Sequence, residues 1–404
     1  MEQTQNQNNY AHLPEELLGK ILDNIPATVE KMNKLFDVQD EPIRKGISVL
    51  RERGFIAKNE TSDFSNSLIA VDGGVVLEKM TGSDILLAVA VGVEGLTTDN
   101  NTGWSDGKNQ YYQWQTVLPH DEANPRLCQG VMFLMELSVL ANADHDIRIM
   151  DGTHFTPILK INSLLSASED KAGHQYVEAL KEFLHETYNK IIPDIPNIVE
   201  SVLGDERIIS IAKYSSSRDI IDAFLKTENI SIDDKTFFSI GLDEDEYLIP
   251  KSVGQSIEER EKIWNDLHIQ CNLKISDDKS DQGKLNIAFE KAVGKLKTKS
   301  VHTGAKESEL YFTYYKPYPD GPAYRIELKK SLALDKTKLE KYLLSIKKQI
   351  VFPEIREPFP QYLVDLMAKN VSGGLYAIQE AIRLSPNLKL EKGKFNLLFN
   401  YRTK

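Results

Sequence analysis

The chain has 404 residues, of which 41% are hydrophobic and 27% are charged, so it has the composition of a globular protein and the length of one large elaborated domain or two. No segment approaches the roughly 20 apolar residues that a membrane helix needs, no signal peptide is visible in the first residues, and the two widely spaced cysteines fit reduced thiols in a cytoplasmic protein. The net charge of −11 counts against tight unaided DNA binding, but it is compatible with an enzyme that offsets phosphate charge with metal ions or receives DNA from a partner.

The first part of the chain is predicted to be a tail followed by a helical arm. Residues 1–10 are rich in Gln and Asn, which is typical of a disordered tail. Apolar residues recur at helical spacing within residues 11–65, with helix starts near Pro14 and Pro26 and a helix end at Gly54. This arm is either a contact surface for a partner or a second copy, or support for the core.

Strands and helices follow in residues 66–225. The expected elements are strands at Leu68–Leu77, Ile85–Val93 and Tyr111–Leu118, a helix at Pro125–Ala143, a strand at Ile147–Met150, a helix at Asp170–Tyr188 and a strand at Arg207–Ala212. Three antiparallel strands followed by alternating helix and strand is the element order of the ribonuclease-H-like fold. We therefore predict an α/β protein with a ribonuclease-H-like mixed sheet, of which residues 66–225 form the first part.

The rest of the chain is predicted to be an insertion followed by the completion of the core. Residues 226–310 have a charged and irregular pattern that indicates an inserted helical and strand subdomain, with a helix at Ser256–His268 and a mobile loop at Ser276–Gly283. Residues 311–404 complete the core with C-terminal helices. The expected elements here are strands at Leu310–Tyr315 and Tyr324–Leu328 and helices at Lys336–Gln349, Gln361–Asn370 and Leu375–Leu384.

Two aspartates end or interrupt apolar strands and are each followed by glycine. Asp72 precedes Gly73 and Gly74, and Asp151 precedes Gly152. A carboxylate in an otherwise buried strand is costly unless it is paired or bound to a cation, and glycine lets a substrate or a metal-bound phosphate approach the backbone closely. Two such acids on neighbouring strands can bind the ions of a two-metal site. The alternative is that each Asp-Gly pair is only a turn.

Glu136 is the third candidate ligand. It is the only acid between Leu127 and Ala143, in a helix that is hydrophobic on nearly all sides and is therefore predicted to be buried. A lone glutamate there needs a partner, and a metal site on the adjacent strand would provide one. Alternatively, Glu136 lies on a solvent-facing stripe with Gln129 and Met132.

Further polar residues follow later strands. Lys213 closes the strand that ends at residue 212, where its ammonium could neutralise a phosphate, while the serines after Tyr214 suit the cap of a helix that starts near Asp219. Arg325 and Glu327 share one face of a strand, either as support for an active site or as a cross-strand salt bridge. The sequence has no GxxxxGK[ST], GxSxG or HExxH motif, which disfavours a P-loop nucleotide hydrolase among other classes.

Five short segments, taken in order, resemble those of the NurA nuclease family. They are Ala70–Gly74, Ile149–Thr153, Ile211–Ser215, Tyr324–Glu327 and Pro358–Leu363. The resemblance implies a ribonuclease-H-like fold and a manganese-dependent nuclease that trims DNA ends. It also implies a homodimer that works with a hexameric HerA-type translocase, and the expected cofactor is two ions of Mn²⁺ or Mg²⁺.

The resemblance also carries over individual residues. The family's first aspartate falls on Asp72, its second on Asp151 and its helix glutamate on Glu136. The histidine that family members carry near the C-terminus falls on Met367, which cannot transfer a proton or bind a hard cation well. Asp365 is one residue that could substitute for it.

We therefore predict that Asp72, Asp151 and Glu136 bind divalent metal and that Lys213 lies near the scissile phosphate. The predicted substrate-binding residues are Tyr214, Arg325 and His154, of which the last could also replace the missing histidine. The predicted function is that of a DNA nuclease acting with a HerA-type translocase in repair or in anti-phage defence. The alternatives are an inactive adaptor that docks on the translocase, favoured by the methionine and the acidic charge, and a small-molecule phosphoesterase.

Overall fold

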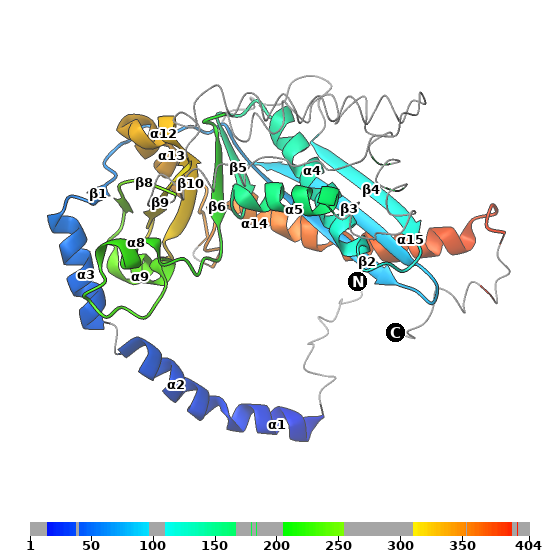
Figure 1. The fold of residues 1–404 in the computed structure, drawn as a ribbon, viewed down its shortest axis with the longest axis horizontal. Coiled ribbons are helices and arrows are strands. Elements are labelled where there is room, and N and C mark those ends of the chain that lie inside the picture. Colours follow the sequence, from blue (N-terminus) through cyan, green and yellow to red (C-terminus); the bar gives the residue numbers. More distant parts are fainter. Residues whose placement is uncertain are drawn as a thin grey trace, which may run out of the picture.

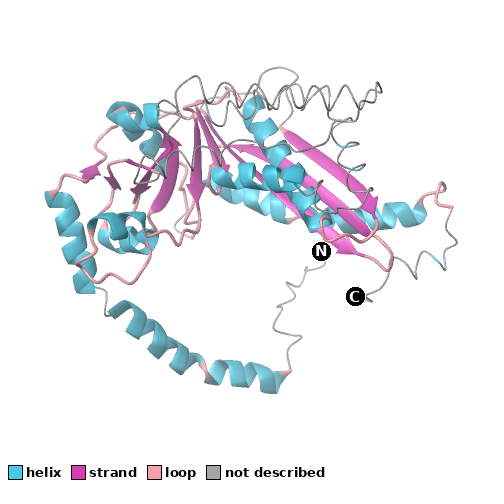
Figure 2. Ribbon diagram, in the orientation of Figure 1, coloured by secondary structure: helices cyan, strands magenta, loops and turns pink. Residues whose placement is uncertain are grey.

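The computed structural model describes residues 14–37, 40–96, 110–166, 205–253, 310–352 and 354–389, together with the single residues 179, 183 and 394. These residues form one large mixed sheet with helices on both faces (Figure 1, Figure 2). The predicted tail at residues 1–10, helix at Ser256–His268 and loop at Ser276–Gly283 lie outside the described residues, as does most of the helix predicted at Asp170–Tyr188.

The sheet has ten strands in the order β1-β7-β9-β10-β6-β5-β2-β3-β4, with β8 paired to β9. They are β1 (Ile56–Lys58), β2 (Leu68–Lys79), β3 (Asp84–Glu94), β4 (Tyr111–Leu118), β5 (Ile147–Asp151), β6 (Ile208–Ala212), β7 (Glu246–Leu248), β8 (Lys251–Ser252), β9 (Leu310–Tyr315) and β10 (Tyr324–Lys329). β2, β3 and β4 are antiparallel, β5 and β6 run parallel to β2, and β10 returns antiparallel to β6.

The strands at the centre of the sheet are buried on both faces. Ile69 and Val71 of β2 pack in one core with α4 (Asn124–Asn142) and α5 (Phe155–Ser166). Leu68 and Ala70 pack in another core with α12 (Lys330–Leu334), α13 (Lys336–Lys348) and α14 (Phe359–Lys369). Successive side chains of a strand point to opposite faces, so a strand covered by helices on both sides reads as a continuous apolar run.

The opposite end of the sheet has a core of its own. There α3 (Asp40–Glu52), α8 (Asp219–Phe224) and α9 (Asp234–Gly241) pack with β7 and β9. Ile47, Phe237 and Phe238 lie against Phe312 and Tyr314 of β9, and the rings of Phe238 and Tyr314 stack with centroids 4.7 Å apart. At the other end of the molecule, α15 (Val371–Leu384) covers the β2–β3 hairpin.

The predicted helical arm consists of three helices with different surroundings. α1 (Glu15–Asp23) and α2 (Ile25–Asp37) extend away from the rest of the described chain (Figure 1). Their exposed large apolar side chains are Leu17, Ile21, Leu22, Ile25, Val29 and Met32. α3 instead buries Ile43, Ile47 and Leu50, and Gly54, with φ +67°, follows its end as predicted. Only the third helix of the arm supports the core.

Several details differ from the sequence-based expectations. Asp72 does not end a strand but lies inside β2. The strand continues to Lys79, which pairs with Asp84 of β3. α5, α9 and β7 were not predicted. β7 has three residues and is too short to show a strand period. β7 joins the main sheet between β1 and β9. Among the described residues, none of the helices combines the length and the apolarity that crossing a bilayer requires.

Candidate metal centre

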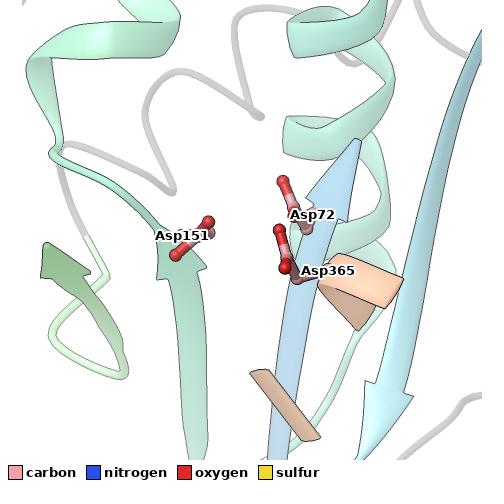
Figure 3. A group of neighbouring side chains, drawn as sticks. All are labelled: Asp72, Asp151 and Asp365. Atoms are coloured by element: carbon pink, nitrogen blue, oxygen red, sulfur yellow. The ribbon is translucent and has the colours of Figure 1, made fainter. Parts of the chain in front are cut away.

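The register of β2 and β5 places Asp72 beside Asp151. The two strands are parallel, and Val71 pairs with Met150, so each aspartate is the next residue along its own strand. Both side chains lie on the α14 face of the sheet, because they alternate with residues that face α4. Asp365 of α14 completes a group whose ligand oxygens all lie within 4.8 Å of one another. Figure 3 shows the three side chains, here called the acidic cluster, projecting toward one another.

A glycine of β2 lets α14 come close enough to contribute to this cluster. A Cβ at Gly74 would lie 2.1 Å from the carbonyl oxygen of Ala368, so only glycine fits beside the backbone of α14. One turn before Asp365, Gln361 donates from Nε2 to Asp151 Oδ1 at 2.6 Å and to the carbonyl oxygen of Ile211 at 3.3 Å. α14 therefore supplies one carboxylate and fixes the orientation of another.

Asp72 is partly buried among other acids, which disfavours its ionised form. Burial raises its pKa to about 7, and repulsion from Asp151 and Asp365 adds to this effect. A hydrogen bond from the backbone N–H of Gly73 at 2.8 Å and the charge of Lys213 act in the opposite direction without cancelling it. A shared divalent cation would remove this penalty.

Glu136 approaches the same centre from the other face of β2. Its side chain is 2% exposed, and a Cβ at Gly73 would lie 2.5 Å from its Oε1. That Oε1 is buried without a hydrogen-bond partner among the described residues. Burial, with repulsion from Asp72 and Asp151, raises the pKa of this carboxyl well above its usual value. A buried oxygen without a donor, next to three more carboxylates, is the donor set that hard cations such as Mn²⁺ or Mg²⁺ prefer.

Two lysines pair with acids of the cluster: the exposed Lys369, whose Nζ lies 2.6 Å from Asp365 Oδ2, and the less exposed Lys213. Lys213 contacts more of these acids. Its Nζ lies 3.2 Å from Glu357 Oε2 and 3.5 Å from both Asp151 Oδ2 and Asp365 Oδ1. Burial of the ammonium lowers its pKa, but attraction to these three acids outweighs burial and leaves the pKa raised. Lys213 therefore stays protonated at the edge of the site.

The remaining predicted residues divide between surface and interior. Tyr214 is 93% exposed directly after Lys213, with Lys235 Nζ 5.9 Å from its ring centroid, so it lies open to solvent beside the centre. His154 and Arg325 are 0% and 6% exposed. Neither presents much surface to a substrate.

Three residues at the site were not predicted as ligands or partners. Asp365 was named only as a substitute for histidine, and Gln361 and Glu357 were not singled out. The four-residue spacing of Gln361 and Asp365 was a usable signal, because residues so spaced share one face of a helix. Met367 is 51% exposed and lies about 200° around the helix from Asp365, so the structure does not bring it to the cluster.

Comparison with known proteins supplies the family. The sequence matches the family described as the NurA domain over residues 66–376, and no curated protein sequence matches it. Among solved structures, the chain is similar to the NurA nuclease from Sulfolobus solfataricus, at 13% identity and a TM-score of 0.51, over 93% of this chain and 100% of that one. Structures of NurA with manganese, and of NurA bound to dAMP and manganese, give TM-scores of 0.43 and 0.45. They are 12% and 10% identical and cover 89% and 93% of this chain, and 99% and 98% of theirs. At these identities the structural likeness establishes the fold, while the family match covers well over half of the chain. The chain therefore belongs to the NurA domain family.

Proposed function

We propose that this protein is a divalent-metal-dependent deoxyribonuclease that hydrolyses phosphodiesters at DNA ends. The observation that carries the proposal is the acidic cluster, in which oxygens of Asp72, Asp151 and Asp365 lie within 4.8 Å of one another. The unpartnered Oε1 of Glu136 beside it extends the donor set. Membership of the NurA domain family agrees with this activity.

The topology supports a ribonuclease-H-like core. The strands β4-β3-β2-β5-β6 are neighbours in that order, with three antiparallel strands followed by two parallel ones. α4 connects β4 to β5 and covers one face. In this arrangement the ligands would lie where β2 and β5 run side by side, and Asp72 and Asp151 occupy that position.

The metal-binding residues would be Asp72, Asp151, Asp365 and Glu136, and two ions of Mn²⁺ or Mg²⁺ suit four carboxylates. Metal held by these residues would supply an activated water and stabilise charge on the leaving oxygen. Gln361 orients Asp151 through its 2.6 Å hydrogen bond.

The side chains that would meet the DNA lie beside this centre. Lys213, protonated and partly buried beside Asp151 and Asp365, would neutralise the scissile phosphate. Tyr214 is exposed beside Lys213, where an aromatic ring can stack on a DNA base.

The direct test is metal dependence on linear DNA. Protein stripped with a chelator should leave end-labelled linear DNA intact, and added Mn²⁺ should restore cutting. Circular DNA of the same sequence is the matched control for the end requirement. Cutting in excess chelator, or no cutting at any Mn²⁺ concentration, would contradict the proposal.

A catalytically inactive adaptor is the second candidate. It is favoured by Met367, which stands where the resembling family carries a histidine, and by Lys213, which already pairs with two acids of the cluster. Calorimetry separates the two, because an adaptor has no need of metal whereas the nuclease must bind Mn²⁺. Absence of Mn²⁺ binding would favour the adaptor.

We further propose that the protein works in the cytoplasm as a homodimer with a HerA-type hexameric translocase, in repair or anti-phage defence. The exposed apolar residues of α1 and α2, including Leu17, Ile21 and Val29, support a contact there, since unpaired apolar helix faces mark interaction sites. Light scattering of wild type and Ile21→Glu tests the dimer, and co-purification with a neighbouring translocase tests the partner. A monomer in both cases would remove the dimer, and failure to co-purify would remove the partner.

A further inference from the structure

A buried glutamate fixes the backbone that follows Asp151. Gly152 turns the chain with φ +92° and donates to the carbonyl oxygen of Ile211 at 3.2 Å. Two residues later, the backbone N–H of His154 donates to Glu327 Oε2 at 3.1 Å. The position of the Asp151 turn therefore depends on a side chain from β10.

The same strand also holds the loop that follows Lys213. Arg325 Nη1 donates to Ser217 Oγ and to Asp219 Oδ2, both at 3.3 Å, and Arg325 Nε donates to Glu327 Oε1 at 3.3 Å. Arg325 and Glu327 are two residues apart on β10 and lie on one face of it. The pair thus connects the backbone after Asp151 to the loop after Lys213.

This pair is buried and internally balanced. Glu327 is 2% and Arg325 6% exposed, and the guanidinium carbon of Arg325 lies 4.2 Å from the ring centroid of Phe312. Burial raises the pKa of Glu327, but the hydrogen bond from His154 and the charge of Arg325 outweigh it and hold the pKa below its usual value. Removing one partner of such a pair leaves a buried charge uncompensated.

Ser210 of β6 strengthens the connection to His154. Its Oγ lies 2.8 Å from His154 Nδ1 and donates to Glu327 Oε2 at 3.4 Å. Ser210 is fully buried, and it pairs with Glu327 in the β6–β10 register. These contacts make the turn after Asp151 a packed, hydrogen-bonded unit.

We propose that Arg325 and Glu327 form a brace that positions Asp151 for metal binding and Lys213 beside it, so that Glu327 is a positioning residue and not a substrate contact. The inference rests on the proposed function, because it requires a metal at the acidic cluster. Partners that orient metal ligands typically cost 10–100-fold in metal affinity or activity when they are changed.

The test is calorimetric titration of metal-free protein with Mn²⁺. Glu327→Gln keeps the shape but removes the charge that holds Arg325, and it should weaken Mn²⁺ binding by roughly 10–100-fold. Ser210→Ala removes only the hydroxyl and should weaken binding by about fivefold. Asp84→Asn is the matched control, because Asp84 is also a 2% exposed carboxylate bonded to a histidine, at the far end of β3.

The outcomes are separable. If wild type binds no Mn²⁺, the proposed function fails and the brace fails with it. If wild type binds and Glu327→Gln binds within twofold of it, only the brace is overturned. If Asp84→Asn loses as much affinity as Glu327→Gln, the loss reflects general destabilisation and the brace is again overturned. Where Glu327→Gln does not fold, Ser210→Ala decides: reduced affinity supports the brace, and unchanged affinity overturns it.

Discussion

The β2–β3 hairpin holds a buried carboxylate, Asp84, at its turn and a partly buried one, Asp72, toward its open end, and the surroundings of the two differ. At one end, Asp84 has Oδ1 2.6 Å from His120 Nδ1, and its Oδ2 accepts from Asn124 Nδ2 at 2.8 Å. Toward the other end, Asp72 lies with two other acids of the cluster, and Glu136 approaches from the other face of β2. In the first arrangement, polar partners contact both oxygens of Asp84. In the second, the carboxylates lie against one another, and the donors present do not cancel the effect of burial and repulsion on Asp72.

This difference distinguishes a structural acid from a functional one. A buried carboxylate with good donors stabilises the fold, whereas buried carboxylates that repel each other cost folding energy unless a cation joins them. Clusters of perturbed acids are typical of functional sites. We propose that this end of the hairpin belongs to the second class, since three acids lie close together there and burial and Asp151 raise the pKa of Asp72 to about 7.

The largest expected effect comes from removing a cluster carboxylate. Asp72→Asn or Asp151→Asn should reduce DNA cutting roughly 10³-fold or more, because the charge stabilisation lost with a metal is several kcal/mol. Asp84→Asn should lower stability by about 1–3 kcal/mol and leave the rate per folded molecule unchanged. Single-turnover cleavage and urea unfolding measure the two quantities. Equal loss of cutting in all three variants would erase the proposed distinction.

A second, smaller effect tests the contact between β2 and α14. Gly74→Ala would place a Cβ 2.1 Å from the carbonyl oxygen of Ala368, so α14 must move away with Asp365. We expect a stability loss of about 1–3 kcal/mol together with weaker Mn²⁺ binding. Gly82→Ala, in the hairpin turn with nothing within 4 Å of its Cβ, is the control and should change neither. Normal Mn²⁺ affinity in Gly74→Ala would show that the α14 approach is dispensable.

A third comparison lies within α14 itself. Asp365→Asn removes one of the three clustered carboxylates and should weaken Mn²⁺ binding by roughly tenfold. Met367→His introduces the family-type histidine, but on the opposite side of the helix, where Met367 is 51% exposed. It should change neither binding nor cutting. If Met367→His raises activity instead, the helix presents a different face to the DNA than the structure indicates.

Much of the site was visible in the sequence because its determinants are local. Apolar runs that end in Asp-Gly predicted Asp72 and Asp151, and a lone acid in an apolar helix predicted Glu136. These patterns depend on neighbours in the chain, and the structure places all three residues at one centre. The antiparallel and parallel central strands were also predicted in their observed chain order.

The rest could not be predicted because it depends on long-range packing. Asp365 joins the cluster only because Gly74 admits α14, a contact between residues almost 300 positions apart in the chain. His154 and Arg325 were predicted to meet substrate, but His154 lies in the turn between β5 and α5, Arg325 lies in β10, and both side chains are buried. β7 extends the sheet through pairing with β1 and β9, which no local period reveals.

The smallest expected effect is the pH dependence of the metal-free protein. In the folded state Asp72 has a pKa of about 7 against 3.8 for the free group, so between these values the native state holds a proton that the unfolded state lacks. The free energy of unfolding should therefore fall as pH rises from about 4 to 7. The stabilisation that this bound proton provides is absent above pH 7. After allowance for solvent screening, the change is about 1–2 kcal/mol.

Urea unfolding in the presence of chelator at pH 5 and pH 8 measures this change. Comparing Asp72→Asn with Asp84→Asn shows whether the change comes from Asp72. Asp72→Asn should flatten the dependence and raise stability at pH 8, because the ionised carboxylate that burial disfavours is gone. It should not remove the dependence completely, since Glu136 also has a raised pKa and acts with the same sign. Asp84→Asn should lower stability while keeping the wild-type difference between the two pH values. If Asp72→Asn keeps that full difference as well, then neither burial nor the neighbouring acids disfavour the ionised form of Asp72 in the folded protein, and the contrast between the two ends loses its physical basis.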